Sequence, residues 1–177
     1  MEYELKNGEI VIIRKPTIDD AKGIVDLISV ADTETKFLSR NPGEFRVTED
    51  EEKSFLNNVL NDNDTDLFVA EYDGKIIGNC SVGLVSRYER YRHRAEVTFV
   101  VLKDYWKIGI GGKLMQQCID WCKEKKVIQI QLRVVADNKH AIKMYESFGF
   151  KATGTIPKAM KYKDGSFTDE IFMVLEL

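Results

Sequence analysis

Residues 96–112 read EVTFVVLKDYWKIGIGG, and this stretch joins a strand-like half to a glycine-rich half. Its first half is rich in β-branched and aromatic residues, which is typical of a strand. Its second half places Gly109, Gly111 and Gly112 just before a segment whose apolar residues recur at helical spacing. Glycines between a strand and a helix let several backbone N–H groups approach a ligand, and the helix N-terminus favours a phosphate or pyrophosphate. The stretch therefore predicts a strand, a phosphate-binding turn and a helix.

Two familiar phosphate motifs do not fit these residues. A dinucleotide fingerprint requires a third glycine where Leu114 stands. A Walker A loop requires Ser or Thr after Gly112-Lys113, and its first glycine is replaced by Lys107. The remaining alternative is that the glycines serve a tight turn and bind nothing.

Strand-like and helix-like segments alternate on both sides of this stretch. The predicted strands cover residues 10–14, 67–72, 75–85, 94–102, 129–135, 151–156 and 168–175. The predicted helices follow Thr17, Thr48 and the glycine turn, and cover 139–148. Asp73-Gly74 predicts a hairpin. The order indicates an α+β fold, in which a central, mostly antiparallel mixed sheet contains one parallel β-α-β crossover and is flanked by helices.

Composition excludes several classes of protein. The chain has 177 residues, with 26 Lys and Arg against 29 Asp and Glu, so its net charge of −3 does not suit a general nucleic-acid binder. No apolar run approaches the ~20 residues of a membrane span, and the first residues do not resemble a signal peptide. Cys80, Cys118 and Cys122 are interpreted as buried, reduced thiols. We expect one cytoplasmic domain over residues 1–177, with neither nucleic acid nor a membrane as partner.

A second motif follows the strand predicted over 129–135. It consists of Asn138, Ala141, Tyr145, Gly149 and Phe150. Together with residues 96–111, it resembles the acetyl-CoA-binding half of the GNAT-superfamily N-acetyltransferases, and residues 13–21 are similar to that family's first strand and helix. The resemblance covers nearly the whole chain. It implies a GNAT-like acyl-CoA N-acyltransferase fold forming a single N-acetyltransferase domain.

The resemblance also implies a binding mode for acetyl-CoA as cosubstrate, without a metal. The CoA pyrophosphate would be held by backbone N–H groups of the turn, from Lys107, Ile108, Gly109, Ile110, Gly111 and Gly112. The pantetheine arm would lie along Phe99, Val100 and Val101, where two parallel strands splay apart. Asn138 would reach the arm or the cofactor. Trp106 stands where relatives often carry Gln or Arg, so we expect its side chain to pack, with the indole also able to cover part of the cofactor.

The implied reaction transfers an acetyl group from the thioester to a primary amine. Tyr145 would face the thioester sulfur and protonate the departing thiolate, since a phenol is a donor at neutral pH. Glu96 is the candidate base for the amine proton, directly or through water. An alternative for Glu96 is an ion pair with Arg94 or Arg92, which would leave His93 or water as the base. Backbone N–H groups near Val101 would polarise the thioester carbonyl.

The sequence is compatible with several classes of acceptor amine. Small basic acceptors, such as polyamines or aminoglycosides, would favour the acidic residues 49–52 and Asp169-Glu170. A protein acceptor would need a groove between residues 33–65 and a loop over 156–167, and free amino acids are a further class. A catalytically silent CoA-binding sensor of the same fold is the alternative to an enzyme. Edge strands near the C-terminus suggest a possible homodimer.

Overall fold

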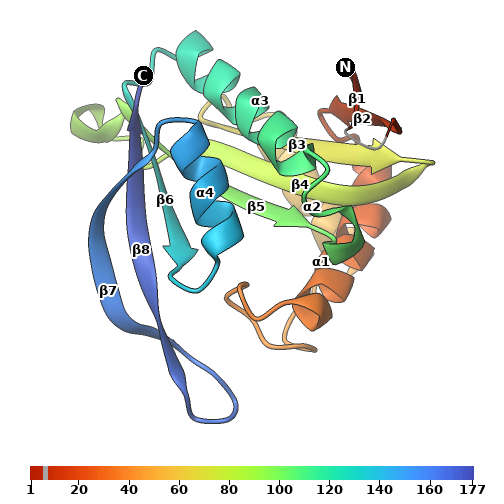
Figure 1. Ribbon diagram of the computed structural model, residues 1–177. Helices are drawn as coiled ribbons and strands as arrows, with labels where there is room; N and C mark the ends of the chain where they lie inside the picture. Colours follow the sequence, from red (N-terminus) through yellow and green to blue (C-terminus); the bar gives the residue numbers. More distant parts are fainter. Residues whose placement is uncertain (6–7) are drawn as a thin grey trace. The chain divides into compact units, whose positions relative to one another are not determined.

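The computed structural model describes residues 1–5 and 8–177 (Figure 1). Contacts within the chain divide it into two compact units. Unit 1 comprises residues 1–83 and 98–121, and unit 2 comprises residues 84–97 and 122–177. One strand, β5 (Arg94–Val101), and one helix, α3 (Ile110–Glu124), contribute residues to both.

The strands of unit 1 follow one another in chain order. They are β1 (Glu2–Glu4), β2 (Ile10–Arg14), β3 (Thr65–Tyr72) and β4 (Lys75–Leu84), followed by residues 98–101 of β5. The pairings among β1 to β4 are antiparallel. Asp73 and Gly74 both have positive φ, of 48° and 70°, as the predicted hairpin turn requires. The strand β1 is not predicted by the sequence, because its three residues become a strand through pairing with β2.

The helices of unit 1 begin where the sequence predicts. Thr17 precedes a 3₁₀ turn, η1 (Ile18–Asp20), which continues into α1 (Ala21–Glu34). The helix α2 (Glu49–Leu60) starts with a capping box, in which the Glu51 N–H donates to Thr48 Oγ1 at 3.3 Å and the Thr48 N–H donates to Glu51 Oε2 at 2.8 Å.

The helices of unit 1 cover both faces of its strands (Figure 1). Buried side chains of α1 and α2 pack against β3 and β4 in one core. This core contains Ala21, Ile24, Leu27, Leu56, Leu67, Val69 and Ile76. Val69 lies opposite Asn79 across the β3–β4 pair, so the next residue, Cys80, points to the other face. There its thiol donates to the Leu114 carbonyl of α3 at 3.5 Å.

Unit 2 contains the predicted parallel pair. Residues 94–97 of β5 lie next to β6 (Gln129–Val135), followed by β8 (Phe167–Glu176) and β7 (Lys151–Lys161). The β5–β6 pairing is parallel, with Arg94 opposite Gln129, whereas β6–β8 and β7–β8 are antiparallel. The helix α4 (Lys139–Ser147) matches its prediction, and short 3₁₀ turns occur at η2 (Glu89–Tyr91) and, in unit 1, at η3 (Lys103–Tyr105). The predicted α+β class with one parallel strand pair is confirmed.

The predicted loop over 156–167 is wrong in extent. The strand β7 continues to Lys161, across an irregularity between Ile156 and Met160 that contains Pro157. Proline has no N–H for a ladder, and Lys158 beside it adopts φ 52° while its N–H donates to Asp169 Oδ1 at 2.8 Å. Pairing between β7 and β8 resumes after this bulge, at Met160 and Thr168, so the loop between the two strands is limited to residues 162–166. Within the described residues, the helices include none with the length and apolarity that crossing a membrane demands.

Candidate active site

The strand β5 directs alternate backbone groups to its two edges. The Leu102 N–H, just after the strand, donates to the Ile77 carbonyl of β4 at 3.0 Å. Thr98 lies four residues before Leu102, and Ser81 lies four residues after Ile77. The hydroxyl oxygens of Thr98 and Ser81 are 2.7 Å apart, so the same antiparallel register continues along both strands. Both groups of one residue point to the same edge of an antiparallel strand and alternate along it. The backbone of the even-numbered residues 98–102 therefore faces β4.

Phe99 and Val101 consequently direct their N–H and C=O groups to the edge of β5 that faces away from β4. This is the edge along which the pantetheine arm is predicted to lie. Val100 differs, because its backbone faces β4 and its side chain packs against the core of α1, α2 and β3. The Val101 carbonyl accepts a hydrogen bond from Trp106 Nε1 at 2.7 Å, while the Val101 N–H points to the same edge. The indole therefore packs against the end of β5, as expected.

Gly78 of β4 also belongs to this region, and sequence reasoning missed it. A Cβ on Gly78 would lie 3.1 Å from the Val100 carbonyl oxygen and 3.2 Å from Val101 Cγ2. These distances are shorter than most real Cβ contacts, so glycine lets β4 approach β5 closely here. A glycine in the interior of a predicted strand was the signal that could have revealed this approach.

The predicted phosphate-binding turn connects η3 to α3. Lys107 has φ 68° and Gly109 has φ 112°, and α3 begins at the next residue, Ile110. The Lys113 N–H donates to the Gly109 carbonyl at 3.1 Å, which is the first bond of the helical ladder. The N–H groups of residues 110–112 precede that bond, so helical geometry provides them with no carbonyl partner. They point out of the positive end of α3, which suits an anion.

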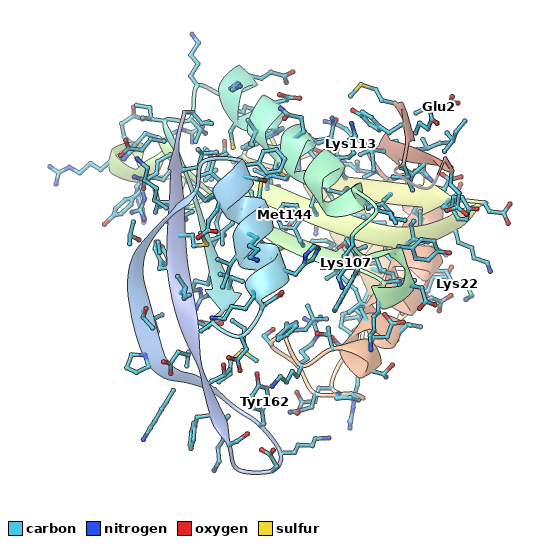
Figure 2. All side chains as sticks on the ribbon, viewed as in Figure 1. Glu2, Lys22, Lys107, Lys113, Met144 and Tyr162 are labelled. Atoms are coloured by element: carbon cyan, nitrogen blue, oxygen red, sulfur yellow. The ribbon has the colours of Figure 1, made fainter. Side chains whose placement is uncertain are left out.

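Two lysines flank this turn, and Figure 2 labels both. Lys107 lies on the loop before α3 and is exposed, whereas Lys113 lies in the first turn of the helix. The Lys113 ammonium is 4.6 Å from the centroid of the Tyr3 ring. The turn thus combines backbone donors, a helix N-terminus and positive charge, and these groups fit a pyrophosphate.

Aromatic residues support η3 from β3. The rings of Tyr72 and Tyr105 lie with centroids 5.8 Å apart. The Tyr72 hydroxyl donates to Glu9 Oε1 at 2.8 Å, and this hydrogen bond raises the pKa of Tyr72 above its ordinary value. The segment that leads into the glycine turn is therefore held from a neighbouring strand as well as by its own bonds.

Glu96, the candidate base, lies on β5 in unit 2. It is half-buried between the buried residues Ala95 and Val97, and it is in register with Gln131 of β6. The Arg94 guanidinium donates to Gln131 Oε1. His93, the alternative base, is exposed, and its carbonyl accepts the N–H groups at the start of β6. The assignment of the base to Glu96 stays a prediction.

Asn138 directly precedes α4 and Tyr145 lies on this helix, both in unit 2. Asn138 caps this helix, because its Oδ1 accepts the Ala141 N–H at 3.2 Å, so its side-chain NH₂ is the group left for a ligand. Tyr145 is seven residues further, on the same face of the helix. Its side chain is 8% exposed, and its ring centroid is 5.9 Å from that of Phe150. Packing therefore fixes the ring of the predicted proton donor.

The acidic residues considered for acceptor binding have structural partners. Glu51 caps α2, and Glu49 Oε1 lies 2.6 Å from the Lys53 ammonium. Asp169 accepts the Lys158 N–H in the β7 bulge. Glu52 is buried, and burial raises its pKa. The acidic run over 49–52 therefore acts mainly as the first turn of a helix.

The structure agrees with the interpretation of the three cysteines as buried thiols. Cys80, Cys118 and Cys122 are all buried. The Sγ atoms of Cys80 and Cys118 are 3.4 Å apart, and burial raises the pKa of Cys80 well above its ordinary value. Both thiols pack between β4 and α3.

Comparison with protein families agrees with this geometry. The profile of the Acetyltransferase (GNAT) family matches residues 30–150. The chain belongs to this family. The matched region includes β5, the glycine turn, α3, β6 and α4, so every predicted catalytic and cofactor-binding residue of this GNAT-family protein lies inside it.

Two curated relatives illustrate the range of the family. The chain is 31% identical over 106 residues to the L-amino acid N-acetyltransferase AaaT of Escherichia coli, covering 59% of this chain and 64% of that protein. It is 29% identical over 110 residues to the spermine/spermidine N(1)-acetyltransferase of Bacillus subtilis, covering 60% of this chain and 66% of that protein. In both cases the match spans just under two thirds of the relative.

Solved structures resemble the whole fold. An acetyltransferase of the GNAT family from Streptococcus pneumoniae superposes with a TM-score of 0.89 at 26% identity, covering 94% of this chain and 99% of that one. The structure of yncA from Salmonella typhimurium, described with its cofactor acetyl-CoA, gives a TM-score of 0.80 at 22% identity, with 94% of each chain covered. The GNAT-like fold inferred from the sequence is thereby confirmed.

Proposed function

We propose that this GNAT-family protein is an acetyl-CoA-dependent N-acetyltransferase, which transfers the acetyl group directly to a primary amine of a small molecule or protein. One observation carries the proposal. The edge of β5 that presents the backbone of Phe99 and Val101 leads, through η3, into a turn from which the N–H groups of residues 110–112 point without helical partners. A ligand with an amide-containing arm and a pyrophosphate matches this sequence of groups.

Acetyl-CoA supplies an activated acetyl thioester. In the proposed binding mode, the turn from Lys107 to Gly112 holds the pyrophosphate through backbone N–H groups, while Lys107 adds positive charge. Phe99 and Val101 hold the arm, and the Val101 N–H is the candidate donor to the thioester carbonyl. The side-chain NH₂ of Asn138 is the group of that residue proposed to reach the cofactor.

Two side chains are proposed to move protons. Tyr145 donates its hydroxyl proton to the departing thiolate, and its packing against Phe150 holds the ring in place for that role. Glu96 accepts the proton of the acceptor amine, directly or through water. Amines of the lysine type are mostly protonated at neutral pH, so a base is needed before the nitrogen can attack.

The acceptor is proposed to be an amine of one of the classes that the relatives' names describe, which include L-amino acids and spermine or spermidine. The structure gives several of the acidic residues considered for a polyamine a role within α2. Glu49 and Glu51 of α2 are engaged by Lys53 and Thr48, and Glu52 is buried. Free amino acids and peptides with a free N-terminus are therefore tested as acceptors alongside polyamines.

A thiol-release assay tests this function. The protein is mixed with acetyl-CoA and a panel of polyamines, aminoglycosides, free amino acids and short peptides, and free CoA is measured with a thiol reagent. We expect release that depends on one acceptor class, with the acetylated product confirmed by mass spectrometry. Binding of acetyl-CoA without release for any acceptor would instead favour a CoA sensor, and absence of binding would refute the proposed cofactor.

A further inference from the structure

The last turn of α1 carries two carboxylates in an unfavourable position. Asp32 and Glu34 lie at the C-terminal end of the helix, where the backbone dipole is negative, and no basic residue lies in that turn. A negative charge is disfavoured there. Each carboxylate accepts hydrogen bonds from a residue outside α1, and these contacts offset the unfavourable interaction with the helix dipole.

Asp32 holds the segment that follows α1. Its carboxylate is buried, at 1% exposure, and accepts two hydrogen bonds from Arg40, at 3.0 Å from Nε and 3.2 Å from Nη2. The Arg40 guanidinium also lies 5.3 Å from the centroid of the Phe45 ring. Residues 35–48, which belong to the segment 33–65 predicted to border a groove for a protein acceptor, are thereby held to the helix.

Glu34 contacts η3, the segment that leads into the glycine turn. Its Oε2 accepts the N–H of Lys103 at 2.7 Å, across 69 residues of sequence. Lys103 is the first residue of η3, and the local cap residue Leu102 makes no side-chain cap bond. Glu34 therefore caps η3 from a distant helix, where a negative charge is favourable.

The contacts continue from η3 to the phosphate-binding turn. The Trp106 N–H donates to the Lys103 carbonyl at 3.1 Å, and its indole bonds to Val101. Lys107 and Gly109 then adopt positive φ, and α3 starts at Ile110. Hydrogen bonds thus connect Lys103 through Trp106 to the loop that leads into the N–H groups of residues 110–112.

We propose that Glu34 is a positioning residue for acetyl-CoA binding, which holds the phosphate-binding turn through the Lys103 N–H. The proposal rests on the proposed function for its ligand. It places Glu34, which holds the cofactor turn, in the same helical turn of α1 as Asp32, which holds residues 35–48. Loss of Glu34 should impair acetyl-CoA binding more than acceptor binding.

The test compares Glu34→Ala and Glu34→Gln with the wild-type protein. Asp26→Asn is the matched control, since Asp26 is an exposed α1 carboxylate whose partner is Lys22 at 2.5 Å. Acetyl-CoA binding is measured by titration calorimetry, and hydrogen exchange of the free protein is followed over residues 103–112. We expect about tenfold weaker binding for Glu34→Ala and about two- to threefold for Glu34→Gln, whose amide oxygen can still accept the bond.

Faster exchange over residues 103–112 in Glu34→Ala, with unchanged exchange in residues 24–31 of α1, supports the positioning role. Binding and exchange equal to the wild type in both Glu34 variants overturn it, as does a lower melting temperature with neither effect. If Glu34→Ala fails to fold, the binding and exchange of Glu34→Gln decide. If the wild-type protein does not bind acetyl-CoA, the proposed function fails, while the exchange comparison still decides whether Glu34 holds the turn.

Discussion

Trp106 Nε1 lies 2.7 Å from the carbonyl oxygen of Val101 and donates a hydrogen bond to it. This bond closes the chain back onto the end of β5, just before the glycine turn. It also occupies one of the backbone groups that a ligand along this edge would otherwise use. The edge available to a pantetheine arm is therefore defined by Phe99 and the Val101 N–H.

Trp106→Phe tests this bond. Phenylalanine keeps an aromatic ring but cannot donate, so we expect a loss of about 1 kcal/mol in the free energy of unfolding and severalfold weaker acetyl-CoA binding. Denaturant unfolding and calorimetry measure the two effects. Trp121→Phe, in the buried part of α3, is the control and should lower stability without changing affinity. Equal affinities for wild type and Trp106→Phe would show that the indole does not shape the site.

Gly111→Val tests the phosphate-binding turn. The valine side chain would occupy space beside the N–H groups of the first turn of α3, so acetyl-CoA binding should weaken at least about a hundredfold, or ~2.8 kcal/mol. The control is Gly154→Val, because a Cβ on Gly154 in β7 has no heavy atom within 4 Å and valine suits a strand. Normal acetyl-CoA binding by Gly111→Val would place the pyrophosphate elsewhere.

Tyr145→Phe tests the proton donor. The ring and its contact with Phe150 are kept, so folding and the acetyl-CoA dissociation constant should stay within about twofold. Turnover should fall by about 10²- to 10³-fold, as expected for loss of a general acid. Steady-state kinetics measure kcat and calorimetry measures the dissociation constant. The control is Tyr88→Phe, because the side chain of Tyr88 is 79% exposed. An unchanged kcat would remove Tyr145 from the mechanism.

Glu96→Gln tests the base. If Glu96 takes the amine proton, the variant should lose about 10²-fold in kcat and the rise of its rate with pH should flatten. The measurement is a pH–rate profile with a saturating acceptor. Preserved turnover with a wild-type profile would assign proton removal to water or His93.

Glu52→Gln tests the buried carboxyl of α2. Burial raises the pKa of Glu52, so the folded state favours its neutral form. Its contribution to stability is fully present below the ordinary glutamate pKa and is lost as the pH rises through the raised value. The glutamine variant should therefore have a higher melting temperature than the wild type at pH 7, and the gain should shrink near pH 4. The exposed Asp50→Asn serves as control, and a gain independent of pH would contradict this explanation.

Most elements follow from local sequence signals. The capping box of Thr48 and Glu51, the Asp73-Gly74 turn and the helix that begins after Asn138 are all confirmed, because each depends on residues a few positions apart. The strand β1 and the extension of β7 past Pro157 were missed, since both exist through pairing with another strand. The sequence pattern ends a strand at proline, whereas the bulge lets the pairing resume.

The family, the order of elements and the position of the glycine turn follow from the amino-acid sequence alone. These are encoded in residue type and short spacings, such as glycines before a helix and an alternating strand. Three features emerge only in the folded chain. They are the backbone groups of β5 that face the outer edge, the hydrogen bond from Trp106 to the Val101 carbonyl, and the capping of η3 by Glu34 from 69 residues away. The physical reason is that hydrogen-bond partners distant in sequence are chosen by the register of strands and the packing of helices, which no local pattern specifies.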